Sequence, residues 1–384
     1  MHALLSGIKV LEQGTFITGP AAGMLLADLG AQVIKVEQPE GGDPFRSFRG
    51  GLYSPHFQTY NRNKQSVTLN PKRPEDAAVF DELVKDADVY IQNFRPGTAE
   101  RLGAAPERLR ALNPRLIYCA ISGFGADGPA AARPAYDTVA QAAAGFLKLL
   151  INPAHPRVVG PAIADALTGF YAAYGVLGAL VERSRTGQGR IVELSMLEAM
   201  CHFNLDAFTH LFSEGEVMGP YSRPSVSQSY VLPCADGKWL ALHMSSPEKF
   251  WQGLARAIEC PTLLLDDPRF ANREARIEHQ EAIAEFLRQR FGQHDRDTWC
   301  RRLEAEDVPH APMYDTLEAT QDAQFRHLQL EVAAAHPAGG NWRTIRSPLS
   351  IDGQRALDVT APPLLGADDD AVLGPIRRRL GQQA

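Results

Sequence analysis

Asp165 is the side chain whose surroundings best fit covalent chemistry in this sequence. It lies just before an almost entirely apolar run, residues 168–181, which predicts a helix buried on nearly every side. The dipole at the start of a helix favours an anion. Ala164 and Ala166 leave open space beside the carboxylate, and a nucleophile needs such clearance whereas a helix cap does not. We therefore predict that Asp165 is a nucleophile; the alternative, that it only caps the helix, stays open.

The predicted helix behind Asp165 contains three glycines, Gly169, Gly175 and Gly178. Each glycine costs about 1 kcal/mol of helix stability relative to alanine. A helix that accepts three of them is expected to pack closely against other backbone. Basic residues in the last turn and Gly187 end this helix, and residues 190–194 then predict a strand.

The chain before this helix alternates between strand and helix patterns. A strand at 8–11, a helix at 20–29 and a strand at 32–36 form a βαβ unit, which implies a right-handed crossover and a parallel sheet. The pattern continues with strands at 67–69, 89–92 and 116–122 and with helices at 74–85 and 106–112. This alternation predicts an α/β fold, with a Rossmann-like doubly wound parallel sheet in the large domain.

Two loops of this domain are candidates for ligand binding. Residues 14–19 follow the first strand, but they lack the G-x-G-x-x-G spacing, which argues against a nicotinamide-dependent oxidoreductase. Residues 43–63 form a long polar and aromatic loop, interpreted either as a solvated basic face or as a funnel for a phosphate-bearing ligand. The cations in or beside this loop are Arg46, Arg49, Arg62 and Lys64.

The second half of the chain changes in character near residue 213. After a mostly apolar helix at 196–212, residues 213–229 are rich in Gly, Ser and Pro and predict a linker. A hairpin pattern and three amphipathic helices predict a small α+β domain at 230–327. Strand patterns and a last helix return in residues 328–384, so we expect the large domain to comprise 1–212 and 328–384.

Composition excludes several classes of partner. The formal net charge of −6 argues against a nucleic-acid partner. We expect no membrane span, because the longest apolar stretch, residues 166–181, is too short, and the N-terminus does not resemble a signal peptide. Five scattered cysteines without a C-x-x-C motif predict reduced thiols in the cytoplasm and no zinc site. The histidines, at spacings that are not typical of ligands, predict no other metal site.

Several segments resemble the class III coenzyme A transferases. They are G-P-A-I-A-D-A-L-T-G at 160–169, R-T-G-Q-G-R at 185–190, N-R-N-K-Q-S at 61–66 and N-F-R-P-G at 93–97. The resemblance covers nearly the whole chain. It implies an interlocked homodimer whose chains thread through each other, with acyl-CoA and a small carboxylic acid as substrates. Coenzyme A would then be a substrate, with no permanently bound cofactor.

The resemblance also implies the site. It identifies Asp165 as the catalytic carboxylate, which attacks the donor thioester to give a mixed anhydride and then carries coenzyme A as an aspartyl thioester. The positions that it implies for contact with coenzyme A are Phe16, Ile17, Thr18, Gln38, Leu69, Asn70, Lys72, Asn93, Phe94, Arg95, Arg101, Tyr136 and Asp137.

Two departures from relatives bear on the substrate and the reaction. Ile17 stands where formyl-CoA transferase has a glutamine, and that enzyme's loop of four glycines is absent, so we expect a small dicarboxylate such as succinate instead of oxalate or formate. A 2-methylacyl-CoA racemase is the alternative enzyme. Racemases of this family pair the aspartate with a histidine, whereas Tyr136 stands here, and a phenol is a poor base. A non-catalytic acyl-CoA binding protein is the remaining alternative.

Overall fold

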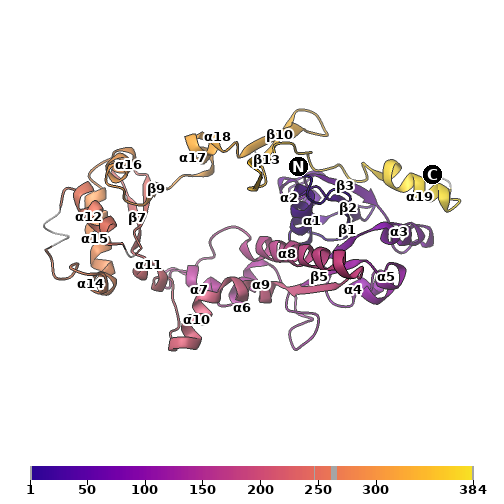
Figure 1. The fold of residues 1–384 in the computed structure, drawn as a ribbon, viewed down its shortest axis with the longest axis horizontal. Helices are drawn as coiled ribbons and strands as arrows, with labels where there is room; N and C mark the ends of the chain where they lie inside the picture. Colours follow the sequence, from indigo (N-terminus) through magenta and orange to yellow (C-terminus); the bar gives the residue numbers. More distant parts are fainter. Residues whose placement is uncertain (1, 246, 261–265, 383–384) are drawn as a thin grey trace. The chain divides into compact units, whose positions relative to one another are not determined.

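The computed structural model describes residues 2–245, 247–260 and 266–382, which form two units. The first unit comprises Met1–Leu147, Val158–Leu205 and Leu328–Ala384, and the second comprises Lys148–Arg157 and Asp206–His327. The chain therefore leaves the first unit twice, for Lys148–Arg157 and for Asp206–His327, and returns to it each time (Figure 1).

A six-stranded parallel sheet is the centre of the first unit (Figure 1). Its order is β3-β2-β1-β4-β5-β6. The strands are β1 (Lys9–Glu12), β2 (Gln32–Glu37), β3 (Lys64–Thr68), β4 (Val89–Gln92), β5 (Ile117–Ser122) and β6 (Ile191–Ser195). The predicted doubly wound α/β fold is confirmed. The strand order reverses between β1 and β4, and such a switch point is where open α/β sheets bind ligands.

Helices cover both faces of this sheet. One face is covered by α1 (Thr18–Asp28) and α8 (Ile163–Thr186), and the other by α3 (Pro74–Asp86), α5 (Pro106–Leu112) and α19 (Gly374–Arg379). Along β4, Val89 and Ile91 pack under α1 and α8, whereas Tyr90 packs under α3 and α5. Successive side chains of a strand point to opposite faces, so a strand covered on both sides is apolar throughout.

Close packing of α8 against α1 explains the first of the three glycines in α8. A Cβ atom on Gly169 would lie 2.7 Å from the Cβ of Ala21 and 3.0 Å from the carbonyl oxygen of Thr18. The predicted approach to other backbone is therefore confirmed at this position. It is wrong for the other two, because Gly175 meets the side chain of Val192 and Gly178 has no described atom within 4 Å of such a Cβ.

The opposite side of α8 is exposed, so the prediction of burial on nearly every side is wrong. Phe170, Tyr174 and Val181 are exposed, Tyr174 by 75%. Among the described residues, α8 is also the one helix whose length and composition would allow it to cross a membrane, a test that core helices of α/β domains pass as well. An apolar run predicts what a helix can bury, but it does not predict how many of its sides are covered.

Two predicted segments differ in their local structure. Residues 43–63 are not one loop, because a 3₁₀ turn, η1 (Pro44–Ser47), and a helix, α2 (Pro55–Tyr60), form within them. Each begins with a proline, whose fixed φ suits the first position of a helix. The predicted helix at 196–212 is interrupted at Asn204, which separates α9 (Met196–Phe203) from α10 (Leu205–Glu214).

The edge strand β3 is covered by the end of the chain. The Ser66 N–H donates to Asp368 Oδ2 at 2.8 Å, and the Thr68 N–H donates to Asp369 Oδ1 at 2.7 Å. The second of these aspartates opens a π-helical turn, η2 (Asp369–Leu373), which runs into α19 beside α3 (Figure 1). Side-chain carboxylates thus satisfy backbone groups that a further strand would otherwise satisfy.

The remaining elements of the first unit are short. They are α4 (Thr98–Arg101), α6 (Asp137–Ala143), α7 (Phe146–Leu150, which ends across the unit boundary) and the strand pairs β10 (Glu331–Ala335) with β11 (Asn341–Ile345) and β12 (Ser350–Ile351) with β13 (Gln354–Arg355). Of these strands, β11 and β13 were not predicted. Both follow glycine-containing turns that the sequence pattern alone did not resolve into hairpins.

The second unit is α+β. Its antiparallel sheet contains β7 (Ser229–Pro233), β8 (Trp239–His243) and β9 (His310–Pro312), of which the first two form the predicted hairpin. Its described helices are α10, whose first residue lies at the unit boundary, and α11 (Ser222–Val226), α12 (Glu248–Ala257), α14 (Arg273–Glu278), α15 (Gln280–Phe291), α16 (Arg296–Ala305), α17 (Thr316–Gln321) and α18 (Ala323–His327). A single apolar core containing Trp251 and Trp299 joins the sheet to α12, α15 and α16.

Candidate active site

A cavity of about 310 Å³ opens at the switch point between β1 and β4. Its walls come from the loops after β1, β4 and β5, from residues 131–136 and from the first turn of α8. The predicted site residues that meet in this cavity are Phe16, Ile17, Thr18, Asn93, Phe94, Arg95, Tyr136 and Asp165. Residues separated by up to about 150 positions in the chain thus surround one space.

Asp165 is the third residue of α8, and it is not the cap of this helix. Its carboxylate accepts no hydrogen bond from any residue that the structure describes. The cap comes from Asp137, whose Oδ1 accepts the N–H of Ala164 at 2.8 Å and that of Asp165 at 3.3 Å. Gln141 donates to the other oxygen of Asp137 at 2.7 Å. The capping alternative for Asp165 is therefore wrong, and its carboxylate is free to react.

Burial raises the pKa of the Asp165 carboxyl group to about 7, and the neighbouring Asp137 carboxylate contributes to the increase. Both effects disfavour the charged form, because each makes the anion less stable than it is in water. A titratable group with a strongly perturbed pKa inside a cavity is a candidate for function. At neutral pH a fraction of Asp165 is protonated and the remainder is an anion able to attack an acyl group.

Asn93 fixes the loop after β1 against the end of β4. Its Nδ2 donates to the carbonyl oxygen of Thr15 at 2.7 Å and to Thr18 Oγ1 at 2.8 Å, and its Oδ1 accepts the Thr15 N–H at 2.9 Å. Gly14 and Gly19 close the same loop, since a Cβ on either would lie 3.0 Å from the Cα of the other. Both the nitrogen and the oxygen of the Asn93 amide thus form hydrogen bonds within the protein. A ligand would therefore contact Asn93 through the part of its side chain that these hydrogen bonds leave uncovered.

The backbone of Phe16 is strained. Its φ is 61°, in the left-handed region that favours glycine. For a residue other than glycine this conformation costs about 1–3 kcal/mol, and such strain is concentrated at functional sites. The ring of Phe16 contacts the ring of Tyr136 edge to face, with 6.1 Å between centroids. Phe16 therefore belongs to the cavity wall through its side chain and to the start of α1 through its backbone.

Helix α1 begins at this wall without a side-chain cap from the described residues. Ile17 is its N-cap, and the described residues provide no acceptor for the N–H groups of Ile17, Thr18 and Gly19. Free N–H groups and the helix dipole make such an end attractive to negative charge. The cavity therefore combines a carboxylate on one wall with donors on another.

The other predicted contacts with coenzyme A lie outside this cavity, along the same carboxyl edge of the sheet. Gln38 follows β2, whereas Leu69, Asn70 and Lys72 follow β3. Gln38 and Lys72 are exposed, and so is Arg101 at the end of α4. Leu69 is only 3% exposed and packs in the core, so its side chain is not available to a ligand.

Three of the four cations of residues 43–64 form neither a solvated face nor a funnel. The fourth, Arg49, is exposed. The other three are buried in ion pairs: Arg46–Glu37, Arg62–Asp28 and Lys64–Glu12, with N–O separations of 2.7, 2.6 and 2.6 Å. The sequence shows cations in a polar segment, but it does not show that acids from β1, β2 and α1 meet them. Both interpretations of these three residues are therefore wrong.

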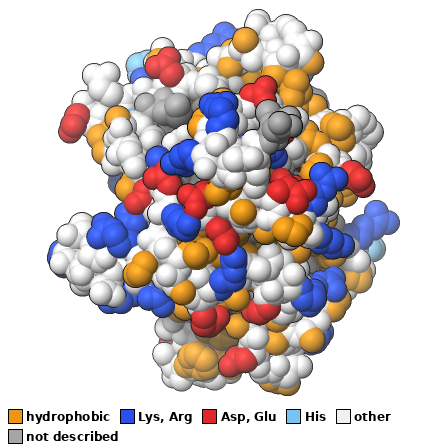
Figure 2. Space-filling model, turned by 90° about the vertical axis from the view of Figure 1, so that its right-hand side faces the viewer, with side chains coloured by type: hydrophobic (Ala, Val, Ile, Leu, Met, Phe, Trp, Pro, Cys, Tyr) orange, Lys and Arg blue, Asp and Glu red, His pale blue; other side chains and the backbone are white. Residues whose placement is uncertain are grey.

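Exposed cations near the cavity come instead from other loops. Arg95 and Arg133 line it and are exposed, and Arg133 also lies over the ring of Phe124, 5.0 Å from its centroid. Arg133 was not predicted, nor were Thr15, Thr98 and Met196, although their places after parallel strands could have indicated them. Figure 2 shows one face of the molecule, on which Lys and Arg side chains are interspersed with Asp and Glu and form no broad basic field.

One described group of side chains has the spacing of metal ligands. His210, Glu214 and Glu216 bring their ligand atoms within 4.8 Å of one another in the second unit. The His210 Nδ1 lies 3.0 Å from Glu216 Oε2, and both glutamates are exposed. A hydrogen bond at this distance joins His210 and Glu216.

A doubly wound sheet whose switch point carries a half-buried aspartate, unpaired among the described residues, is typical of an α/β enzyme. The family model for CoA-transferase family III matches residues 5–369, and the chain belongs to this family. The predicted family and the predicted enzyme class are confirmed.

Relatives of this chain transfer coenzyme A between several acids. It is 34% identical to a succinyl-CoA–D-citramalate CoA-transferase of Chloroflexus aurantiacus, over 87% of this chain and 84% of the relative. It is 32% identical to a succinate–glutarate CoA-transferase of Agrobacterium fabrum, over 97% and 95%. Among solved structures, it is similar to a CAIB/BAIF family protein from Brucella suis, with 30% identity, a TM-score of 0.86 and coverage of 98% of this chain and all of the other.

Proposed function

We propose that this protein moves coenzyme A from an acyl-CoA donor to a carboxylic acid through covalent intermediates on Asp165. The observation that carries the proposal is the Asp165 carboxylate itself. It is unpaired among the described residues, it has a pKa raised to about 7 by burial, and it lines a cavity at the switch point of the sheet. A carboxylate is a known covalent nucleophile in enzymes.

Each half of the proposed reaction consists of two acyl transfers that involve Asp165. A carboxylate oxygen of Asp165 attacks the thioester carbon, the C–S bond breaks, and a mixed anhydride and the CoA thiolate result. The thiolate then attacks Cγ of Asp165, which releases the donor acid and leaves an aspartyl-CoA thioester. The acceptor carboxylate attacks this thioester, and the thiolate released attacks the acceptor's carbonyl carbon in the new anhydride and restores Asp165.

Negative charge develops on an acyl oxygen in each of these steps. Ile17 and Thr18 line the same cavity as Asp165, and their N–H groups have no acceptor among the described residues. Donors aligned in advance stabilise such an oxyanion. We assign this role to the N–H groups of Ile17 and Thr18.

We propose a small dicarboxylate such as succinate as one of the two acids. The names of two similar relatives contain succinate or succinyl-CoA, which supports this choice. A formyl-CoA:oxalate CoA-transferase of Streptomyces avermitilis is 31% identical, over 95% of this chain and 93% of the relative. Ile17, which lines the cavity, gives it an apolar side chain in place of an amide, so we do not propose oxalate.

Coenzyme A would lie along the carboxyl edge of the sheet, with its thioester at Asp165. Lys72, Arg95 and Arg101 are exposed along this edge and suit its phosphates. The other proposed contacts are those implied by the resemblance, with the side chain of Leu69 excluded. The proposal includes no metal and no permanently bound cofactor.

A homodimer in the cytoplasm completes the proposal. The exposed apolar side of α8, with Phe170, Tyr174 and Val181, is the kind of surface that an obligate partner covers. The five cysteines are free, as reduced thiols of a cytoplasmic protein would be. Light scattering at low micromolar concentration should give the mass of a dimer, and the mass of a monomer would contradict this part.

A matrix of acyl-CoA donors against carboxylate acceptors, read by mass spectrometry, tests the transfer. Asp165→Ala and Asp165→Asn should both fold and should lower turnover by roughly three orders of magnitude or more. Wild-type protein incubated with acyl-CoA and then hydroxylamine should show a mass change on the peptide that contains Asp165. An active Asn variant with an unmodified wild-type peptide would refute the assignment.

The racemase alternative has its own readout. The side chain at the position of the second base is Tyr136, which is 61% exposed and lines the cavity. We expect no exchange of the α-proton of a 2-methylacyl-CoA in heavy water, and rapid deuterium uptake would favour the racemase. Binding of acyl-CoA without any turnover would favour the non-catalytic alternative.

A further inference from the structure

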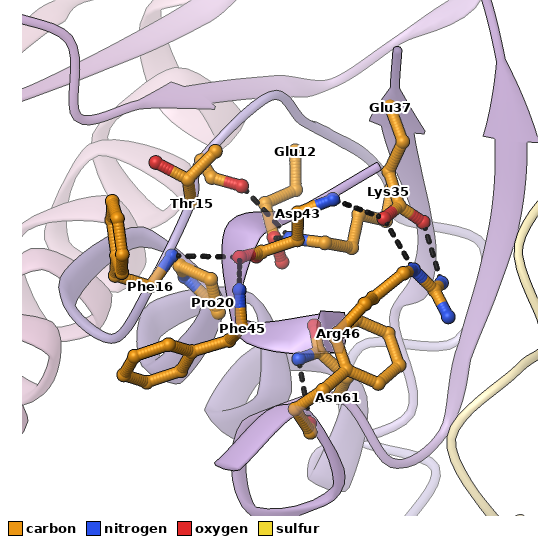
Figure 3. Close-up of polar contacts among 12 residues, drawn as sticks. Glu12, Thr15, Phe16, Pro20, Lys35, Glu37, Asp43, Phe45, Arg46 and Asn61 are labelled. Carbon is orange, nitrogen blue, oxygen red and sulfur yellow. Dashed lines mark hydrogen bonds and ion pairs between the residues drawn. The ribbon is translucent and has the colours of Figure 1, made fainter. Parts of the chain in front are cut away.

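A buried ion cluster lies behind the loop that separates β1 from α1 (Figure 3). It consists of Glu12, Lys35, Asp43 and Lys64, whose side chains are fully inaccessible. Lys35 Nζ lies 2.8 Å from Glu12 Oε1 and 3.0 Å from Asp43 Oδ2. Burying such ions has a large desolvation cost, so a buried ion pair is weak evidence for a role in stability alone.

Asp43 connects this cluster to the loop after β1. Its Oδ1 accepts the N–H of Phe16 at 3.1 Å and the N–H of Phe45 at 2.9 Å, whereas its Oδ2 faces Lys35 (Figure 3). Lys35 itself donates to the carbonyl oxygen of Gly14 at 2.8 Å. Lys35 and Asp43 therefore hold the loop at Gly14 and at Phe16, and neither of the two lines the cavity.

Phe16, whose N–H group bonds Asp43, is also the strained residue of the loop. A left-handed conformation at a residue other than glycine persists only where its surroundings impose it. The hydrogen bond from the Phe16 N–H to Asp43 is such a constraint, and the edge-to-face contact between Phe16 and Phe45, at 5.2 Å, is another. Asp43 acts on both, because it accepts the N–H groups of both phenylalanines.

The conformation of Phe16 affects two other parts of the cavity that Asp165 lines. Directly after Phe16 the chain enters α1, whose free N–H groups begin at Ile17. The Phe16 ring contacts Tyr136, the residue just before the aspartate that caps α8. A change in the backbone at Phe16 would therefore move two parts of the cavity wall at once.

We propose that Asp43 is a positioning residue for the transfer reaction: with its charge balanced by Lys35, it holds Phe16 in the left-handed conformation that aligns the start of α1 with Asp165. Asp43 is 1% exposed and does not itself line the cavity. This inference rests on the proposed function, since it concerns the turnover of acyl-CoA at Asp165.

Asp43→Asn is the variant that tests it. Asparagine keeps the shape and an oxygen that can accept both N–H groups, but it removes the charge that pairs with Lys35. We expect kcat for transfer to fall about 10- to 100-fold, as it does when reacting groups are misaligned by about 1 Å. The KM for acyl-CoA should change by less than about threefold, because the proposed phosphate contacts lie elsewhere on the sheet edge.

Asp28→Asn is the matched control. Asp28 is also buried and pairs with Arg62 at 2.6 Å, but in the described part of the chain its side chain forms no hydrogen bond or ion pair with the loop after β1. Asp28→Asn should lower the melting temperature, as Asp43→Asn should, but it should leave kcat within about twofold of wild type. This comparison distinguishes a positioning role from a general loss of stability. An equal fall of kcat in both variants, or an unchanged kcat in Asp43→Asn, would overturn the inference.

A second substitution tests the route through the backbone. Glycine adopts the left-handed conformation without strain, whereas alanine does not, and both remove the ring. The double variant Phe16→Gly/Asp43→Asn should therefore retain several-fold more turnover than Phe16→Ala/Asp43→Asn, and equal turnover would overturn the inference. If Asp43→Asn does not fold, the two double variants are compared by their yield of soluble protein. A higher yield with glycine than with alanine at position 16 supports the inference, and equal yields overturn it. A wild type without transfer would instead overturn the proposed function.

Discussion

Replacing Asp165 by asparagine should make the protein more stable at neutral pH, although it should abolish transfer. Folding raises the pKa of this carboxyl group from 3.8 to about 7, mainly through burial. Between these pH values the folded protein retains a proton that the unfolded chain has lost. Stability therefore falls as pH rises through this window, and asparagine, which does not ionise, avoids the loss.

The size of the effect follows from the two pKa values. A difference of about three pH units at 1.36 kcal/mol each sets an upper value of about 4 kcal/mol. Asp165 is partly exposed, and solvent screening reduces this to about 1–3 kcal/mol. At about 2–4 °C per kcal/mol for a domain of 150–250 residues, the melting temperature of the variant should rise by several degrees at pH 8.

Thermal unfolding of wild type and Asp165→Asn at pH 5, 6, 7 and 8, at one protein concentration, measures this difference. It should grow from pH 5 to 7 and then stay constant. Glu40→Gln, which removes an exposed carboxylate, should show no such trend. A variant that is less stable than wild type at pH 8, or a difference that does not change with pH, would refute the electrostatic reasoning.

Three further predictions concern the same unit. For wild type, kcat/KM should rise with pH through about 7, because Asp165 loses its proton there. Asp137→Asn removes a neighbouring negative charge and should therefore move this rise to lower pH. A wild-type profile that is flat over pH 5.5–9, or a variant profile that does not move, would contradict this. Gly169→Ala should lower the free energy of unfolding, measured with denaturant, by about 1–3 kcal/mol, because its Cβ would overlap α1. Gly178→Ala should raise this free energy by up to about 1 kcal/mol, because its Cβ meets no described atom. The reverse order of the two variants would contradict the packing. Calorimetry at two salt concentrations should show weaker binding of free coenzyme A at the higher one, and binding that salt does not affect would contradict the role of the exposed cations.

The fold and the residue that we propose to react could be predicted from local patterns. Strand and helix periods along residues 8–122 define a parallel sheet, because each element buries its own apolar side. Asp165 could be identified because small residues surround it at the start of an apolar helix. Both inferences depend on residues close together in the chain.

The parts that could not be predicted depend on residues far apart in the chain. Asp137 caps the helix of Asp165 from 28 positions away, and no spacing rule connects them. Arg46 and Arg62 looked like surface cations because their partners lie on other elements. Charge in a sequence predicts that a partner is needed, but only the tertiary structure shows whether water or an acid provides it.

The aspartates that cover β3 have a consequence for how the chain reaches its folded state. The strand is synthesised early, whereas its covering carboxylates lie about 300 positions later and are synthesised only after the whole second unit. During the synthesis of the whole second unit, the backbone groups of Ser66 and Thr68 therefore lack these partners. An uncovered strand edge can pair with another chain, so the nascent protein passes through a period in which it is exposed to aggregation and to chaperones. Emergence of Asp368 and Asp369 from the ribosome ends this period.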